Sequence, residues 1–157
     1  ESYNELKLEG YGISTHFPLE FQSSSKKGVI RGMHFQRKPY AQAKLIRVIS
    51  GKAFDVVVDM RKHSSTYGKW FSTVLSADNN KMLWIPVGFA HGFIALEDDT
   101  IMHYKVTAPY NKESEGGIIW DDPQLAIPWE TENPILSERD LKHPKWKDGE
   151  RLFRQYI

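Results

Sequence analysis

Short segments of β-forming residues, separated by turns, recur along most of this chain and limit the folds open to it. Seven segments are rich in Val, Ile, Phe, Tyr and Trp: residues 28–36, 44–50, 52–60, 70–75, 81–86, 92–96 and 100–107. Successive segments are spaced by roughly 8–12 residues, as in β-sandwiches and barrels and unlike alternating strands and helices. The sequence therefore predicts an all-β fold.

The stretches between these segments carry turn and loop residues. Ser50 and Gly51 separate the second segment from the third and predict a tight hairpin. Residues 23–27, three serines and two lysines, predict a surface loop. Helix signals are few: residues 136–141 predict one helical turn, with Ser137 as its N-cap. The last third of the chain, rich in Pro and Trp, predicts an ordered wrap of loops over the barrel.

Length, charge and composition narrow the class of protein. A chain of 157 residues predicts a single domain, residues 1–157. The net charge of +1 gives no general case for binding nucleic acid or a membrane. The absence of cysteine excludes disulfides, zinc–thiolate sites and a cysteine nucleophile. No apolar run approaches the ~20 residues of a membrane span, and no secretory signal opens the chain, so a cytoplasmic location is expected.

Polar residues interrupt several of the predicted strands. Arg31, His34, Lys44, His91 and Tyr104 all lie among apolar neighbours. A small barrel fills its interior with side chains or holds one ligand, and a buried charge without a partner is costly. These residues are therefore candidates for a ligand site. The sequence contains no phosphate-binding glycine loop, dinucleotide fingerprint or nucleophile elbow.

One histidine motif raises the possibility of a metal site. Pro86-x-Gly88-x-x-His91 resembles the second half-motif of the cupin jelly rolls. Metal-binding cupins also carry a His-x-His pair with a nearby Glu in the first half-motif, where this chain offers only His34. No metal is therefore expected, and a metal-dependent cupin enzyme is kept as an alternative.

Longer motifs resemble one family. Residues 31–36 read R-G-M-H-F-Q and residues 41–47 read A-Q-A-K-L-I-R. They resemble the R-G-L-H-[YF]-Q and A-Q-G-K-L-V-R stretches of the dTDP-4-dehydrorhamnose 3,5-epimerases. The resemblance continues in the family's order through residues 54–62, 83–93, 119–123 and 136–140, and so covers nearly the whole chain. Residues 1–3 are similar to the family's F-x-E-S-Y stretch, so we expect the native protein to begin with a further strand upstream.

The resemblance implies a fold and an activity. The family has a metal-free, cupin-type jelly-roll barrel with a few short helical turns, uses no cofactor and usually forms homodimers. It inverts C3 and C5 of a nucleotide-diphospho-4-keto-6-deoxyhexose, converting dTDP-4-dehydro-6-deoxyglucose to dTDP-4-dehydrorhamnose. Such an isomerase would supply deoxysugars for a bacterial surface polysaccharide such as O-antigen, or for a glycosylated product.

The resemblance also implies roles for particular residues. His34 matches the general base, Asp140 its partner, Lys44 a group near the keto oxygen and Tyr104 the acid on the opposite face. Further matches to positions that contact the nucleotide-sugar, besides Lys44, are Arg31, His91, Glu115, Glu1, Tyr110 and Arg139. In the family's dimers, a residue at the position of Glu1 would contact the neighbour's ligand. His16, His63, His103 and His143 match nothing catalytic and are predicted to be surface or packing residues.

The residue types suit this chemistry. A neutral imidazole, with an ordinary pKa of about 6.5, can remove a proton next to a ketone, and a carboxylate can stabilise the imidazolium that forms. An ammonium stabilises the developing enolate, and a phenol can donate a proton from the other face. The chain departs from the family by carrying Leu19, Glu20 and Phe21 in place of Gln-Asp-Asn, and Ala43 in place of Gly. Another nucleotide, or inversion of one centre only, therefore remains open.

Overall fold

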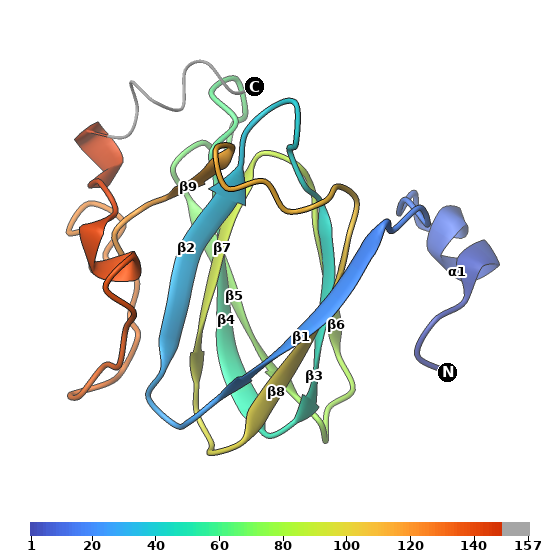
Figure 1. The fold of residues 1–157 in the computed structure, drawn as a ribbon, viewed down its shortest axis with the longest axis horizontal. Coiled ribbons are helices and arrows are strands. Elements are labelled where there is room, and N and C mark those ends of the chain that lie inside the picture. Colours follow the sequence, from blue (N-terminus) through green and yellow to red (C-terminus); the bar gives the residue numbers. More distant parts are fainter. Residues whose placement is uncertain (149–157) are drawn as a thin grey trace.

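The computed structural model describes residues 1–148 and consists mainly of two antiparallel sheets packed face to face, as expected for a jelly roll (Figure 1). The first sheet has the order β1 (Leu19–Ser25), β8 (Thr100–Val106), β3 (Lys44–Ser50) and β6 (Met82–Ile85). The second has the order β5 (Trp70–Ser76), β4 (Lys52–Asp59), β7 (Phe89–Ala95), β2 (Ile30–Gln36) and β9 (Glu115–Gly117). The predicted all-β, jelly-roll fold is confirmed.

The alternation of side chains along the strands creates two hydrophobic cores. Residues i and i+2 of a strand share a face. Val57 of β4 therefore packs between the sheets with Phe93 and Met102, whereas Val56 and Val58 belong to a second core. The first core forms the barrel interior, and it leaves room at one end for polar side chains.

The second core lies on the outer face of the five-stranded sheet, under the C-terminal segment. Trp129 and Trp146 pack there and are 4% and 2% exposed. Hydrogen bonds hold both residues in place: the Trp129 Nε1–H donates to the Trp120 carbonyl, and the Trp146 backbone N–H donates to Asp122 Oδ2, both at 2.7 Å. This segment, orange to red in Figure 1, runs beside β2 and β9. The predicted ordered wrap is confirmed up to residue 148, and its remainder, residues 149–157, lies outside the described residues.

A bulge in β2 determines which of its side chains enter the barrel. Arg31 pairs with Phe93 and His34 pairs with His91, so two residues of β2 between these pairs lie opposite a single residue of β7. In a regular strand, residues three apart point to opposite faces. The extra residue of a bulge removes that offset. Arg31 and His34 consequently line the same cavity.

Three details differ from the expectations. Ser50 and Gly51 do not form a hairpin, because β3 and β4 belong to different sheets and the chain turns a corner between them. Residues 23–25, expected in a loop, are part of β1, which pairs with β8 over its full length. A short helix, α1 (Glu5–Gly10), was not expected, and it buries none of its residues.

The predicted turn near residue 136 is present in altered form. A 3₁₀ helix, η1 (Asp140–Lys142), begins later than expected, and Ser137 Oγ accepts a hydrogen bond from the Asp140 N–H at 3.1 Å. The N-cap of η1 is Arg139, which makes no side-chain capping bond, so the predicted N-cap at Ser137 is wrong, although the Ser137 side chain does bond the backbone of the first residue of η1. No helix in residues 1–148 has the length and apolar character needed to cross a membrane.

Candidate active site

A cavity of about 420 Å³ lies between the two sheets and gathers most of the predicted site residues. Nine of the ten line it, and they come from both sheets and from the C-terminal segment: Arg31, His34, Lys44, His91, Tyr104, Tyr110, Glu115, Arg139 and Asp140. Apolar walls are supplied by Phe21, Phe35 and Phe93. A mostly apolar pocket with a few convergent polar groups is the usual form of a small-molecule site.

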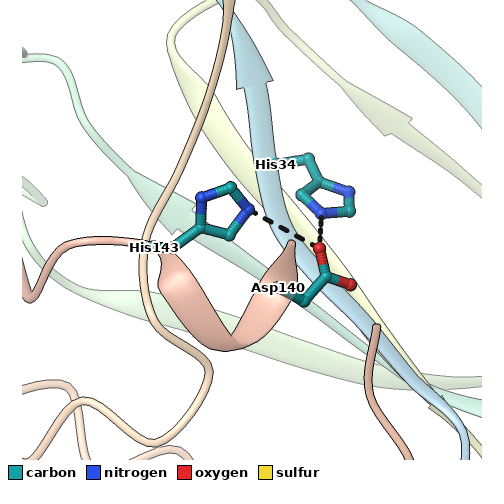
Figure 2. Close-up of side chains that lie close together, drawn as sticks. All are labelled: His34, Asp140 and His143. Atoms are coloured by element: carbon teal, nitrogen blue, oxygen red, sulfur yellow. Dashed lines mark hydrogen bonds and ion pairs between the residues drawn. The ribbon is translucent and has the colours of Figure 1, made fainter. Parts of the chain in front are cut away.

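His34 and Asp140 form a hydrogen-bonded pair at one wall (Figure 2). His34 Nε2 lies 2.6 Å from Asp140 Oδ1, and the two side chains are 21% and 4% exposed. An ionised carboxylate only accepts hydrogen bonds, so Nε2 carries the proton and Nδ1 keeps a lone pair. Burial lowers the pKa of His34, although Asp140 acts in the opposite direction. His34 is therefore neutral, and able to accept a proton, at neutral pH.

The Asp140 carboxyl stays ionised despite its burial. Burial by itself would raise its pKa, but the ring nitrogens of His143 and His34 outweigh this effect and hold the pKa below its usual range. Ser137 helps to position the group, because its Oγ accepts a hydrogen bond from the Asp140 backbone N–H. The carboxylate can therefore stabilise an imidazolium on His34.

Lys44 enters the same cavity from the other sheet. Burial lowers the pKa of its ammonium to about 8, against the attraction of Asp55 and Glu115. The Lys44 charge in turn helps to lower the pKa of His34. The imidazole and the ammonium thus act on one enclosed space, as the proposed chemistry requires.

Asp55 lies on β4, is fully buried and contacts His91, which lines the cavity. Its Oδ2 lies 2.8 Å from His91 Nε2, and burial raises its pKa. Its other oxygen, Oδ1, has no hydrogen-bond partner in the described part of the chain. Asp55 therefore anchors His91, and it lies close enough to Lys44 for each of the two groups to influence the pKa of the other.

Tyr104 lies on β8, in the sheet that faces His34. Its ring stacks on Phe21, with 4.5 Å between centroids and 9° between planes, and meets His91 edge-on. Burial raises the pKa of the phenol. Tyr104 therefore stays protonated through the physiological range and can act as a proton donor.

Charged residues gather at the mouth of the cavity. Arg31 is held by β1, through Ser25 Oγ at 3.0 Å and the Ser24 carbonyl at 3.1 Å. Arg139 donates to both oxygens of Glu115 at 2.9 and 3.0 Å, and Tyr110 donates to Glu115 Oε2 at 3.1 Å. Two guanidinium groups at one opening suit an anionic ligand, because their planar donors match phosphate geometry.

One side-chain group in residues 1–148 has the composition of a metal site. Possible ligand atoms of His34, Asp140 and His143 lie within 4.8 Å of one another. Two ligands on one tetrahedral zinc ion lie roughly 3.3 Å apart, since each bond is about 2.0–2.1 Å. The 2.6 Å between His34 and Asp140 is shorter, so this pair is arranged as a hydrogen bond. The expected absence of a metal stays a prediction.

Comparison with known proteins identifies the family. A family model described as dTDP-4-dehydrorhamnose 3,5-epimerase matches residues 1–148. The chain belongs to the dTDP-4-dehydrorhamnose 3,5-epimerase family. The Escherichia coli K12 protein of that name is 49% identical over 157 residues, covering 98% of this chain and 79% of the relative.

Solved structures of the family have the same fold. A dTDP-6-deoxy-D-glucose-3,5-epimerase from Legionella pneumophila, in complex with dTDP-4-keto-L-rhamnose, is 40% identical with a TM-score of 0.92, covering 98% of this chain and 82% of that one. A 3′-monoepimerase from Streptomyces bikiniensis, in complex with dTDP-quinovose, is 30% identical with a TM-score of 0.90, covering 97% and 78%. The fold thus occurs in enzymes described as inverting two centres and in one described as inverting a single centre.

Glu1 is the one predicted family residue that does not line the cavity. It pairs with Lys7 at 2.6 Å and accepts a hydrogen bond from Asn4 at 2.9 Å. It instead borders a small pocket that includes Arg47 and Lys81. Within one protomer, Glu1 therefore does not belong to the site.

Sequence reasoning missed two residues that the fold brings to the family's site. Asp55 was given no role, although a carboxylate within the apolar run 53–58 was a signal for it. His143 was expected to be a surface or packing residue, but its ring lies beside Asp140 and His34. No local pattern marked His143, because its proximity depends on how the C-terminal segment folds back. His103 does lie outside the cavity, paired with Glu20 at 2.7 Å.

Proposed function

We propose that this chain is an epimerase that inverts C3 and C5 of dTDP-4-dehydro-6-deoxyglucose, giving dTDP-4-dehydrorhamnose. The observation that carries the proposal is the single cavity that holds a His–Asp pair and an ammonium, with a protonated phenol on the facing sheet. Family membership and the substrates named for related structures support it.

His34 acts as the general base. Its Nδ1 takes the proton from the carbon next to the ketone, and the electron pair moves to the keto oxygen as an enolate. Asp140 stabilises the imidazolium, and the Lys44 ammonium stabilises the enolate oxygen in a poorly hydrated pocket. No cofactor is needed, because the ketone itself accepts the electrons.

Tyr104 completes the inversion. Its hydroxyl gives a proton to the carbanionic carbon from the face opposite His34, because the two residues stand on opposite sheets. A phenol with a raised pKa holds its proton until the strongly basic enolate carbon removes it.

The mouth of the cavity binds the nucleotide diphosphate. Arg31 and Arg139 pair with the diphosphate, while His91, Glu115 and Tyr110 contact sugar and nucleoside. Leu19 and Phe21 replace two amides of the family pattern, and Phe21 lines the cavity, so its wall selects by shape and not by hydrogen bonds. We also propose that the protein is a cytoplasmic homodimer, in which Glu1 reaches the neighbour's ligand.

The test is exchange with solvent. Incubating dTDP-4-dehydro-6-deoxyglucose with the protein in deuterated water should place deuterium at C3 and C5, measured by NMR and mass spectrometry. His34→Ala should lower the rate by about 10²–10⁴-fold, because general-base catalysis contributes that much. It should leave dTDP binding within a few-fold, measured by calorimetry. His63→Ala, at an exposed histidine, is the matched control.

The outcomes separate the alternatives. Deuterium at one carbon only identifies a single-centre epimerase, like the Streptomyces bikiniensis relative named above. No deuterium at either carbon refutes the proposed function. Activity that disappears with a chelator and returns with iron, manganese or zinc would instead support a metal-dependent cupin enzyme.

A further inference from the structure

The ring of His143 occupies a space that is left by the absence of a side chain at Gly117. His143 follows η1, and the next residue is anchored because the Ile119 N–H donates to the Pro144 carbonyl at 2.9 Å. A Cβ on Gly117 would lie only 2.4–2.5 Å from three atoms of the His143 ring. Gly117 pairs with His34 across β9 and β2, so the absence of a side chain there opens room for the ring next to His34.

Within that place the ring faces the catalytic pair. His143 Nε2 lies 3.6 Å from Asp140 Oδ1, the same oxygen that bonds His34 at 2.6 Å (Figure 2). The two imidazole rings meet edge-on, with centroids 5.5 Å apart. His143 Nε2 is buried and has no hydrogen-bond partner among residues 1–148. A buried polar atom without a partner costs about 1–3 kcal/mol, so its position calls for an explanation.

We propose that His143 is a positioning residue that acts on His34 through Asp140. This inference rests on the proposed function, in which His34 is the base. His143 is not among the residues that line the cavity, so the proposed role is indirect. It presents an N–H to the Asp140 oxygen when neutral in the Nε2 tautomer, or a positive charge when protonated.

Both forms of His143 lower the basicity of His34. Asp140 favours the imidazolium form of His34, and any donor or cation that shares its oxygen weakens that attraction. With His143 removed, the full carboxylate charge acts on His34, so the pKa of His34 rises. The other titratable and charged groups of neighbouring elements stay in place. Lys44 on β3 and Arg139 before η1 act on His34 directly, while Glu115 on β9 pairs with Arg139, and His91 on β7 pairs with Asp55 on β4.

Two amide substitutions test the role. His143→Gln keeps an N–H near the Nε2 position, whereas the shorter side chain of His143→Asn cannot reach it. His34 is titrated by NMR through its Cε1–H resonance, assigned as the signal lost in His34→Gln. The pH dependence of deuterium exchange is measured in parallel. We expect His143→Asn to raise the pKa of His34, and the acidic limb of the exchange profile, by about 0.5–1 unit. His143→Gln should stay near wild type.

Several results would overturn the inference. One is an unchanged His34 titration in a folded His143→Asn protein. Equal shifts in both variants would overturn it too, because they would show a packing effect. His63→Asn controls for the loss of an imidazole elsewhere. The NMR titration needs no substrate, so a wild-type protein that fails to exchange deuterium refutes the proposed function without obscuring this result. If His143→Asn does not fold, His143→Phe removes the same donor and takes its place.

Discussion

Burial acts on three side chains of this cavity in directions that suit their proposed roles. It lowers the pKa of His34, lowers that of Lys44 to about 8 and raises that of Tyr104. Desolvation disfavours the charged form of each group, so the base is neutral and the phenol is protonated. For Lys44, burial disfavours the form that the proposed reaction needs. Its ammonium persists only up to a pH of about 8.

The pH profile of exchange should therefore be bell-shaped. The rate should rise as His34 loses its proton, below the ordinary value of 6.5, and fall as Lys44 loses its own near pH 8. Lys44→Arg keeps the charge to higher pH, so its alkaline limb should move up by at least one unit, while its maximum falls because arginine is bulkier. The measurement is initial exchange rate from pH 5 to 10. An alkaline limb that does not move in Lys44→Arg would remove Lys44 from this role.

The sequence predicts some residues of the cavity and its surroundings but not others. His34, Lys44, Tyr104 and Asp140 were named because they match family motifs, and all four line one cavity. Their catalytic roles stay predictions. His143 could not be found in this way, since it reaches Asp140 through the course of the C-terminal segment and not through any spacing in the sequence.

At the scale of elements, the irregular pairing of β2 with β7 brings the side chains of Arg31 and His34 into the same cavity. Gly32 lies within the β2 bulge with φ of 137°, in a region that suits glycine, and a Cβ there would lie 2.5 Å from Gly92 Cα. That contact is between backbones, so no side chain can rotate to relieve it. The bulge thus depends on a glycine at this position.

Gly32→Ala should lower the free energy of unfolding by about 2–4 kcal/mol, through backbone strain and overpacking. It should also reduce exchange, because the bulge orients His34. Urea denaturation followed by fluorescence measures the first effect. Gly10→Ala is the matched control: a Cβ there meets nothing within 4 Å, so stability should stay within about 1 kcal/mol of wild type. Equal stability of the two variants would contradict this account of the bulge.

The strands were predictable where their residues alternate or are strongly β-forming, as in β4 and β8. β1 was not, because Gln22 and three serines carry little strand signal, and its pairing with β8 supplies what local propensity lacks. The wrong hairpin at Ser50 and Gly51 has a related cause. A tight turn signal does not reveal whether the strands on either side pair with each other or enter different sheets.

At the scale of the whole molecule, the N-terminal segment differs from the rest because it leaves large apolar side chains exposed. α1 buries no residue, and its Leu6 and the adjacent Tyr11 are 80% and 81% exposed. Large apolar side chains exposed together suit a protein interface. This supports the proposed homodimer, for which light scattering should give twice the 18.2 kDa protomer mass at micromolar concentration. A protomer mass would refute it.

Subunit mixing tests whether the proposed dimer shares its sites. Glu1 lies outside its own cavity, so a Glu1→Ala protomer should damage only its neighbour's site. Mixed dimers of Glu1→Ala and His34→Ala protomers then contain one site with both defects and one site with neither. Their exchange activity should recover to about half that of wild type, although each variant alone is impaired. If Glu1 served its own site, both sites of the mixed dimer would be defective and mixing would restore nothing. His63→Ala mixed with His34→Ala gives the level expected when one site is intact.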